Sequence, residues 1–200
     1  MVKRIVLKEN AEGKGYTISD SGMCTVYEND VVISDEDKYA ISEVQFDKDS
    51  YVTSIGENAF KNCPKLSVVY FPQNVNMTIN RNAFEGCKNL YKLDFDNTRY
   101  IDYNLYYGAF SMCGFEELDF SSKLLCISCY DQDVFTGCRN LRTVKIGPHC
   151  EIDYYSFGES CSNLSDIVIY DDGEYSDWVE ETADEFRSYY GDDAVVVKHV

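Results

Sequence analysis

The segment IGENAFKNCPKLSVVYFP, residues 55–72, contains the motif from which the fold follows. A small residue and a phenylalanine stand just before a cysteine, and the pattern L-x-x-V-x-F comes directly after it. Related segments recur along the chain at intervals of 22 to 26 residues, centred on Phe60, Phe84, Phe110, Phe135 and Phe157. Internal periods of this size are typical of proteins built from stacked repeats.

Each copy also carries a cysteine and a short apolar pattern at the same places. The cysteines are Cys63, Cys87, Cys113, Cys138 and Cys161. In the first copy the apolar residues are Leu66, Val69 and Phe71, and the last two are separated by one residue, which is the period of a strand with one buried face. We therefore predict one strand per repeat and a turn in its other half, around Ile55 and Gly56 in the first copy, where the glycine permits a tight bend. One repeat cannot bury its apolar face alone, so neighbours must stack through parallel strands. We expect the five phenylalanines to form one buried column and the outward positions of the strands to align in rows.

The string I-G-x-x-A-F-x-x-C-x-x-L-x-x-V-x-F-P resembles the BspA-like class of leucine-rich repeats, and the resemblance covers residues 41–170. It implies a right-handed repeat solenoid with a parallel β-sheet and little helix except a C-terminal capping helix. Three departures stand out. Phe115 replaces the usual leucine one residue early, the stretch 95–109 is long and rich in tyrosine, and the last repeat has an insertion between Phe157 and Cys161, so we expect these repeats to bulge.

The chain divides into three parts, of which the repeats at 41–170 are the second. In residues 1–40, short β-rich runs at 4–9, 16–19, 24–29 and 31–34 are separated by glycine, aspartate and asparagine. These runs indicate either an N-terminal β cap or further degenerate repeats, and the sequence leaves both alternatives open.

Residues 171–200 predict a C-terminal cap made of a helix and a strand. Asp177 and Glu180 have the spacing of a capping box. Apolar side chains then recur at helical spacing, at Val179, Ala183, Phe186 and Tyr190. The strand-like run AVVVKHV follows, and helix plus strand resemble the cap of BspA-like chains. We expect Trp178, the only tryptophan, to pack within this cap.

The nine cysteines favour buried free thiols over disulfides or a metal site. Repeat cysteines on adjacent parallel strands lie about 4.8 Å apart, whereas disulfide Cβ atoms prefer about 3.8 Å. Cys126-x-x-Cys129 with Cys150 and His149 is one conceivable zinc site, but structural zinc usually takes paired C-x-x-C motifs and the chain has one. We therefore place Cys126 and Cys129 in the turn half of a repeat as packing residues, and expect no metal and no cofactor.

Charge and hydropathy restrict the partners. The net charge of −17 repels nucleic-acid phosphates and anionic membrane surfaces, so we expect no nucleic acid as partner. The sequence has no apolar run approaching twenty residues, so we expect no membrane insertion. The first residues lack the apolar core of a secretory signal, which favours a cytoplasmic protein, although BspA-like relatives are often secreted or displayed on the cell surface.

The sequence carries no nucleophile motif, phosphate-binding glycine loop or zinc-protease motif, so we do not expect an enzyme. The resemblance implies a non-enzymatic protein–protein interaction module that binds a protein ligand, of unspecified identity, on the strand face. A structural spacer or a cell-surface adhesive segment is the alternative. The candidate binding residues are Tyr70, Tyr91, Asp94, Glu117 and Asp119. The tyrosines would act as anchors and the carboxylates would select a basic partner, while the tyrosine-rich segment 100–107 is a second candidate site.

Overall fold

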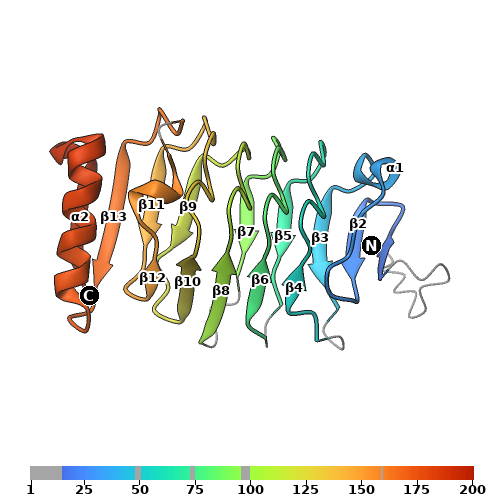
Figure 1. Ribbon diagram of the computed structural model, residues 1–200, viewed down its shortest axis with the longest axis horizontal. Coiled ribbons are helices and arrows are strands. Elements are labelled where there is room, and N and C mark those ends of the chain that lie inside the picture. The colour runs from blue at the N-terminus through green and yellow to red at the C-terminus, as the bar shows by residue number, and fades with distance from the viewer. Residues whose placement is uncertain (1–14, 48–50, 73–74, 96–99, 159) are drawn as a thin grey trace.

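The structure is a computed structural model that describes residues 15–47, 51–72, 75–95, 100–158 and 160–200. It is a repeat solenoid in which strands lie side by side along the long axis, with a helix across the C-terminal end (Figure 1). Strand pairing is parallel throughout the described residues except between the first two strands. None of the helices in the described ranges is long and apolar enough to cross a membrane.

The L-x-x-V-x-F segments form one wall of the solenoid, in two sheets. The first sheet has the order β1 (Tyr16–Ile18), β2 (Met23–Val26), β3 (Glu43–Phe46), β5 (Val68–Tyr70) and β7 (Lys92–Asp94). The second has the order β14 (Val195–His199), β13 (Asp166–Asp171), β11 (Thr143–Ile146) and β9 (Glu117–Phe120). The predicted strand of each repeat is confirmed, but the described residues show no pairing between β7 and β9, so the wall is interrupted there.

A second wall lies where the sequence predicted turns. Its strands are β12 (Cys150–Glu151), β10 (Leu125–Cys129), β8 (Ile101–Leu105), β6 (Met77–Ile79) and β4 (Ser54–Ile55), in one continuous sheet. The turn predicted at Ile55 and at Cys126 and Cys129 is therefore wrong. The longest of these strands alternate as well: in β8, Ile101, Tyr103 and Leu105 are buried and the residues between them are not.

The bulge predicted in the tyrosine-rich stretch is not seen where the structure describes it. Strand β8 pairs in regular register with β6 on one side and with β10 on the other. Part of the stretch, residues 96–99, lies outside the described residues.

The core between the walls contains the predicted column of five phenylalanines, all fully buried. Successive ring centroids from Phe60 to Phe157 are 5.1, 5.2, 5.7 and 5.4 Å apart. The second wall contributes Tyr103, whose ring meets Phe71 and Phe95 edge-on at 5.4 and 4.8 Å. Aromatic contacts therefore join the two walls at the level of Tyr103.

In the first four copies, the turn around the phenylalanine has two residues with positive φ. In the first copy these are Asn58 and Asn62, both at φ 60°. The next three copies have Asn82 and Gly86, Gly108 and Met112, and Asp133 and Gly137 at the same places. Gly56 is not among them, so the tight bend predicted there is wrong. A side chain at Gly56 would instead come within 3.1 Å of the Asp30 backbone, so the glycine permits close approach of the preceding turn.

The repeat cysteines are buried, as predicted, and all nine cysteines are free thiols. The thiols of Cys87, Cys113, Cys138 and Cys161 donate to the backbone carbonyl of the phenylalanine in the preceding repeat, at 3.1 to 3.3 Å. The carbonyls of Phe60, Phe84 and Phe135 also accept the backbone N–H of the cysteine in their own repeat, so the thiol adds a second bond that links two successive repeats.

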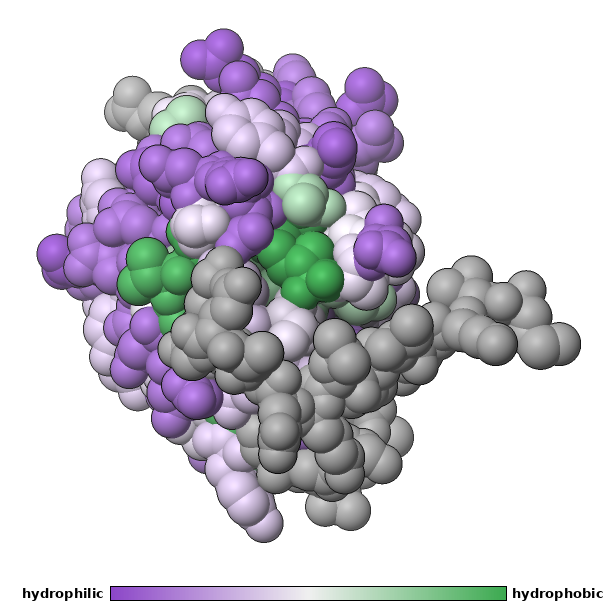
Figure 2. All heavy atoms as spheres, turned by 90° about the vertical axis from the view of Figure 1, so that its right-hand side faces the viewer, coloured by the Kyte–Doolittle hydropathy of each residue, from purple (hydrophilic) through white to green (hydrophobic). Residues whose placement is uncertain are grey.

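The N-terminal end combines an antiparallel pair with the parallel wall. Strand β2 continues the wall beside β3, and β1 pairs antiparallel to β2. The run at 31–34 is not a strand: Ser34 caps the short helix α1 (Asp35–Lys38) by accepting the Asp37 N–H. The predicted run at 4–9 lies outside the described residues. Figure 2 views this end, where apolar atoms show between mostly hydrophilic ones.

The C-terminal end is closed by helix α2 (Ser176–Tyr190), preceded by the 3-10 turn η1 (Tyr154–Ser156) in the last repeat and followed by η2 (Asp192–Ala194). The helix buries Val179, Ala183 and Phe186, and the Phe186 ring lies 6.1 Å from Phe157 at the end of the column. Trp178 packs against this core, partly buried. The predicted capping box is wrong, because the helix starts at Ser176 and its N-cap residue makes no side-chain capping bond.

Candidate functional site

The outward positions of the L-x-x-V-x-F strands align into rows across the first wall. The first row reads Gln45, Tyr70 and Asp94 in one sheet and Asp119, Lys145 and Val168 in the other. The second reads Glu43, Val68 and Lys92, then Glu117, Thr143 and Asp166. Parallel pairing in register produces these rows, because every strand occupies the same place in its repeat. Val68 is nevertheless buried beneath its neighbours.

The predicted binding residues lie on both sides of the interruption in this wall. Tyr70, Tyr91 and Asp94 belong to the last two strands of the first sheet, and Glu117 and Asp119 belong to β9. The structure describes no backbone ladder between the two groups. Phe95 and Phe120 touch edge-on across the interruption at 5.9 Å, so the core is continuous beneath it.

A lysine that the sequence interpretation left without a role contacts two of the predicted carboxylates. Lys145 Nζ donates to Asp119 Oδ2 at 3.1 Å and to Glu117 Oε1. This contact could have been predicted from the register of the rows, because Lys145 lies directly beside Asp119 in the next repeat. Both carboxylates are therefore already paired with the ammonium group of Lys145.

The electrostatics follow from these contacts. Partial burial raises the pKa of Asp119, but hydrogen bonds from Ser121 and Lys145 outweigh it and hold the pKa below its ordinary value. Hydrogen bonds to Glu117 and Asp119 raise the pKa of Lys145. Both partners are consequently charged near neutral pH. The lysine side chain is 30% exposed and the two carboxylates are about half exposed, and ion pairs open to solvent contribute only about 0 to 1 kcal/mol.

The first half of the face repeats this arrangement on one strand. Lys92 Nζ lies 2.8 Å from Asp94 Oδ1, and hydrogen bonding to Asp94 raises the lysine pKa. Tyr91, just before that strand, is 59% exposed, whereas Tyr70 is half-buried. Burial first, and the charge of Glu43 second, raise the pKa of Tyr70, so it stays a neutral phenol. The face thus offers aromatic area beside alternating charges.

The second predicted site, the tyrosine-rich segment 100–107, is not one surface. Tyr103 is fully buried in the core, while Tyr100 and Tyr107 are exposed. Tyr106 stacks on Tyr130 of the next repeat at 5.7 Å. The tyrosines of this segment therefore do not share one surface: Tyr103 lies in the core, and Tyr100 and Tyr107 are exposed at the two ends of β8.

The cysteines considered for zinc do not converge. Cys150 is buried and its thiol donates inward to the carbonyls of Phe120 and Leu125. Cys126 and Cys129 are only partly buried, on strand β10. Burial raises the pKa of the Cys126 thiol to about 11, which leaves it protonated near neutral pH.

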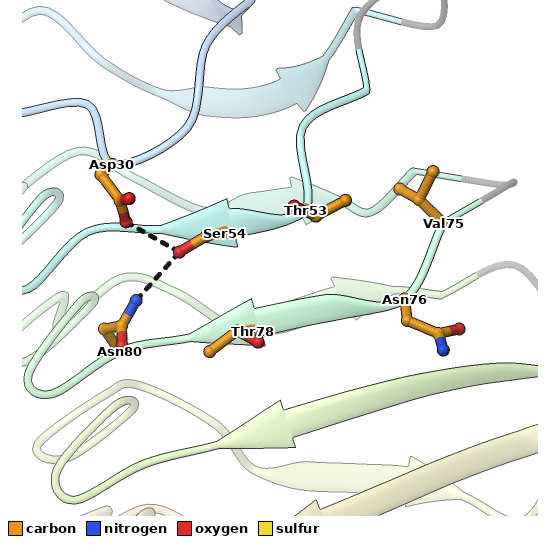
Figure 3. Close-up of a pocket in the computed structure, with 7 residues that line it drawn as sticks. All are labelled: Asp30, Thr53, Ser54, Val75, Asn76, Thr78 and Asn80. Atoms are coloured by element: carbon orange, nitrogen blue, oxygen red, sulfur yellow. Dashed lines mark hydrogen bonds between the residues drawn. The ribbon is translucent and has the colours of Figure 1, made fainter.

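A hollow of about 820 Å³ lies on the outer side of the second wall (Figure 3). Its lining residues are Asp30, Thr53, Ser54, Val75, Asn76, Thr78 and Asn80. Ser54 Oγ donates to Asp30 Oδ1 at 2.7 Å and accepts from Asn80 Nδ2 at 3.0 Å. These three groups therefore satisfy one another across three successive turns of the solenoid.

Comparisons with known proteins agree with this architecture. The family model for the BspA type leucine rich repeat region matches residues 53–176 in six copies. Among curated proteins no match was found.

Two solved structures share the fold. A leucine-rich repeat protein from Bacteroides ovatus is 20% identical with a TM-score of 0.52, and the match covers 78% of this chain and 47% of that one. The leucine rich repeat protein of T. pallidum is 19% identical with a TM-score of 0.54, covering 96% of this chain and 81% of that one. This chain therefore spans about half the length of the B. ovatus protein.

Proposed function

Because the chain belongs to the BspA-type leucine-rich repeat family, we propose that it is a non-enzymatic module that binds a protein ligand on the outward face of its first wall. The binding surface comprises Tyr70, Tyr91, Asp94, Glu117 and Asp119. One observation carries the proposal: strands of successive repeats present outward side chains in aligned rows, with Tyr70 and Asp94 in the first sheet, Glu117 and Asp119 on β9, and Tyr91 just before β7. An extended array of this kind suits a large partner better than a small molecule.

The tyrosines supply the contact area. Tyr91 exposes a large apolar ring, and Tyr70 lies in the row of the strand before it. Tyrosine gives up little conformational entropy on binding and keeps a polar tip, which suits recognition surfaces. They would therefore act as the anchors of the interface.

The carboxylates favour a basic partner, although Lys92 and Lys145 already pair with them. The chain carries a net charge of −17, which would steer a basic protein toward it. Arginine from a partner can bind a carboxylate through two parallel hydrogen bonds, which a lysine cannot match. A partner arginine would thus replace Lys145 at Asp119 or Lys92 at Asp94, at small cost because both existing pairs are exposed.

The experiment begins with affinity capture from the native cell and its surroundings, followed by a binding titration with the purified partner. A quadruple variant, Tyr70→Ala, Tyr91→Ala, Asp94→Lys and Asp119→Lys, should abolish that binding while the melting temperature stays near wild type. The matched control changes the same number of tyrosines and charges on the second wall and just after its strands: Tyr107→Ala, Tyr130→Ala, Glu57→Lys and Glu151→Lys. Loss of binding in the control, with retention in the first variant, would place the interface on the second wall.

A further inference from the structure

The two histidines of the chain lie against consecutive aspartates at the C-terminal cap. His149 belongs to the loop between β11 and β12, and Asp172 and Glu174 belong to the loop between β13 and α2. Strands β11 and β13 are parallel neighbours, with Ile146 beside Ile169. The loops that follow them therefore meet at the same edge of the sheet, although they are far apart in sequence.

The side chains of His149, Asp172 and Glu174 converge at this edge. One ligand atom from each, an imidazole nitrogen and two carboxylate oxygens, lies within 4.8 Å of the other two. His149 and Asp172 are mostly enclosed, with side chains 14% and 15% exposed. The rings of Tyr100 and Tyr175 flank the imidazole, with centroids at 5.3 and 6.0 Å. The cluster is thus a partly enclosed group and not a row of solvated acids.

The two histidine–aspartate pairs differ in geometry. His199 Nδ1 lies 2.9 Å from Asp171 Oδ2, and Asp171 also accepts from the Gly173 N–H and the Ser176 hydroxyl. The Asp171 carboxylate is therefore fully used in holding the cap together. By contrast, His149 Nε2 lies 3.6 Å from Asp172 Oδ2, which is too long for a hydrogen bond.

Asp172 is oriented for a further contact. Its Oδ1 accepts the Glu174 N–H at 3.2 Å, which fixes the carboxylate and leaves Oδ2 directed at His149. Carboxylates that bind metals are commonly held in this way by a hydrogen bond to the other oxygen. Asp172 and Glu174 lie close together, and among the described ion pairs neither has a lysine or arginine partner. A bound cation would neutralise their negative charge.

The donor set selects the class of cation. Calcium and magnesium take oxygen ligands, whereas an imidazole nitrogen combined with carboxylate oxygens suits zinc and its first-row neighbours. Three protein ligands plus water is a usual zinc coordination. We propose that His149, Asp172 and Glu174 bind one divalent transition-metal ion of the zinc type, which would link the capping loop to the last repeats. This site is separate from the proposed protein-binding face.

The test titrates the full chain with zinc ions in a buffer containing a non-thiol reductant, by calorimetry and by the emission of Trp178 in the adjacent helix. One ion per chain should bind, and His149→Ala and Glu174→Gln should each weaken binding roughly tenfold or more. Glu174 is exposed, so Glu174→Gln tests the site even where His149→Ala folds poorly. The control His199→Ala removes the other histidine and should keep wild-type affinity. Unchanged affinity in both site variants would overturn the proposal.

The nine free cysteines are the competing zinc ligands, and cobalt distinguishes them. Cobalt bound by nitrogen and oxygen should show weak visible bands that persist in Cys126→Ser and disappear in His149→Ala. An intense near-ultraviolet thiolate band that disappears in Cys126→Ser would assign the metal to cysteine and overturn the proposal.

Discussion

At the scale of single residues, the turn of each repeat tolerates only certain side chains at two places. Asparagine, glycine and aspartate fill the positive-φ positions around the Ala-Phe pairs, with one exception. Met112 adopts φ 54° although methionine has no local hydrogen bond to offset this backbone conformation. Its side chain is half exposed over Gly137 of the next repeat, so packing offsets little of that cost.

We therefore expect Met112→Asn to stabilise the protein by about 1 kcal/mol, because asparagine tolerates the left-handed region at low cost. For a chain of this size that corresponds to a rise of about 2–4 °C in melting temperature. Thermal unfolding followed by circular dichroism measures it. Met112→Ala is the control, since it shortens the side chain without relieving the backbone, and a similar gain in both variants would contradict the explanation.

The buried thiols predict an alkaline limit to stability. Burial raises the pKa of Cys161 to about 11 and that of Cys150 to about 12. In the unfolded chain these thiols ionise near pH 8.5 to 9, so below that pH the stabilisation is fully present. Between about pH 9 and 11 the unfolded state alone loses protons, and the free energy of unfolding must fall.

Urea unfolding at a series of pH values tests this expectation, with Cys161→Ala as the comparison. The variant should lose less stability than wild type between pH 9 and 11, because one shifted thiol is gone while the tyrosines are unchanged. Identical slopes in the two proteins would show that Cys161 does not contribute.

At the scale of elements, the capping helix is attached through Asp171 at the end of β13. That carboxylate accepts from Gly173, Ser176 and His199, and so connects the strand to the first helical turn and to β14. The Gly173 N–H foremost, then the Ser176 hydroxyl and His199, hold the pKa of Asp171 below its ordinary value despite the opposing effect of burial.

Asp171→Asn should destabilise the cap at neutral pH, because a neutral amide cannot accept all of these bonds. The native pKa is lowered, so the stabilisation from the carboxylate is complete above its unfolded pKa of about 3.9 and disappears as the pH falls through the native value. The stability difference between variant and wild type should therefore shrink below about pH 4. Asp177→Asn, in the exposed first turn, is the control and should leave stability nearly unchanged.

At the scale of the whole molecule, two observations bear on cooperativity. The first wall is interrupted between β7 and β9, whereas the second wall runs from β4 to β12 in one sheet. The phenylalanine column also runs without interruption past the break. Nearest-neighbour coupling in a solenoid then passes through the second wall and the core, so we expect one unfolding transition.

Phe84→Ala should cost roughly 3–5 kcal/mol, because the cavity left in the middle of the column cannot be filled by neighbours held in their own repeats. The loss should appear equally in far-ultraviolet circular dichroism and in the fluorescence of Trp178 at the far end of the molecule (Figure 1). If the circular dichroism transition shifted and the Trp178 transition did not, the two sides of the interruption would be separate folding units.

Much of the architecture was predictable because a repeat gives each position the same neighbours in every copy. The spacing of the Ala-Phe pairs was enough to predict the phenylalanine column, the burial of the cysteines, the parallel strands of the first wall and the register of its outward rows. These features depend on the local period and on the stacking of repeats, and the residue pattern indicates both directly.

Other features follow from contacts between segments far apart in the chain. Strands of two residues, such as β4 and β12, are too short to show alternation, so the second wall looked like turns. The parallel ladder stops between β7 and β9, and the residue pattern did not predict this break. The contact of His149 with Asp172 depends on two irregular loops, which have no repeating pattern. The ion pairs of Lys145 and the bonds of Asp171 depend on side-chain distances that the backbone sets after folding, and a periodic pattern contains no information about them.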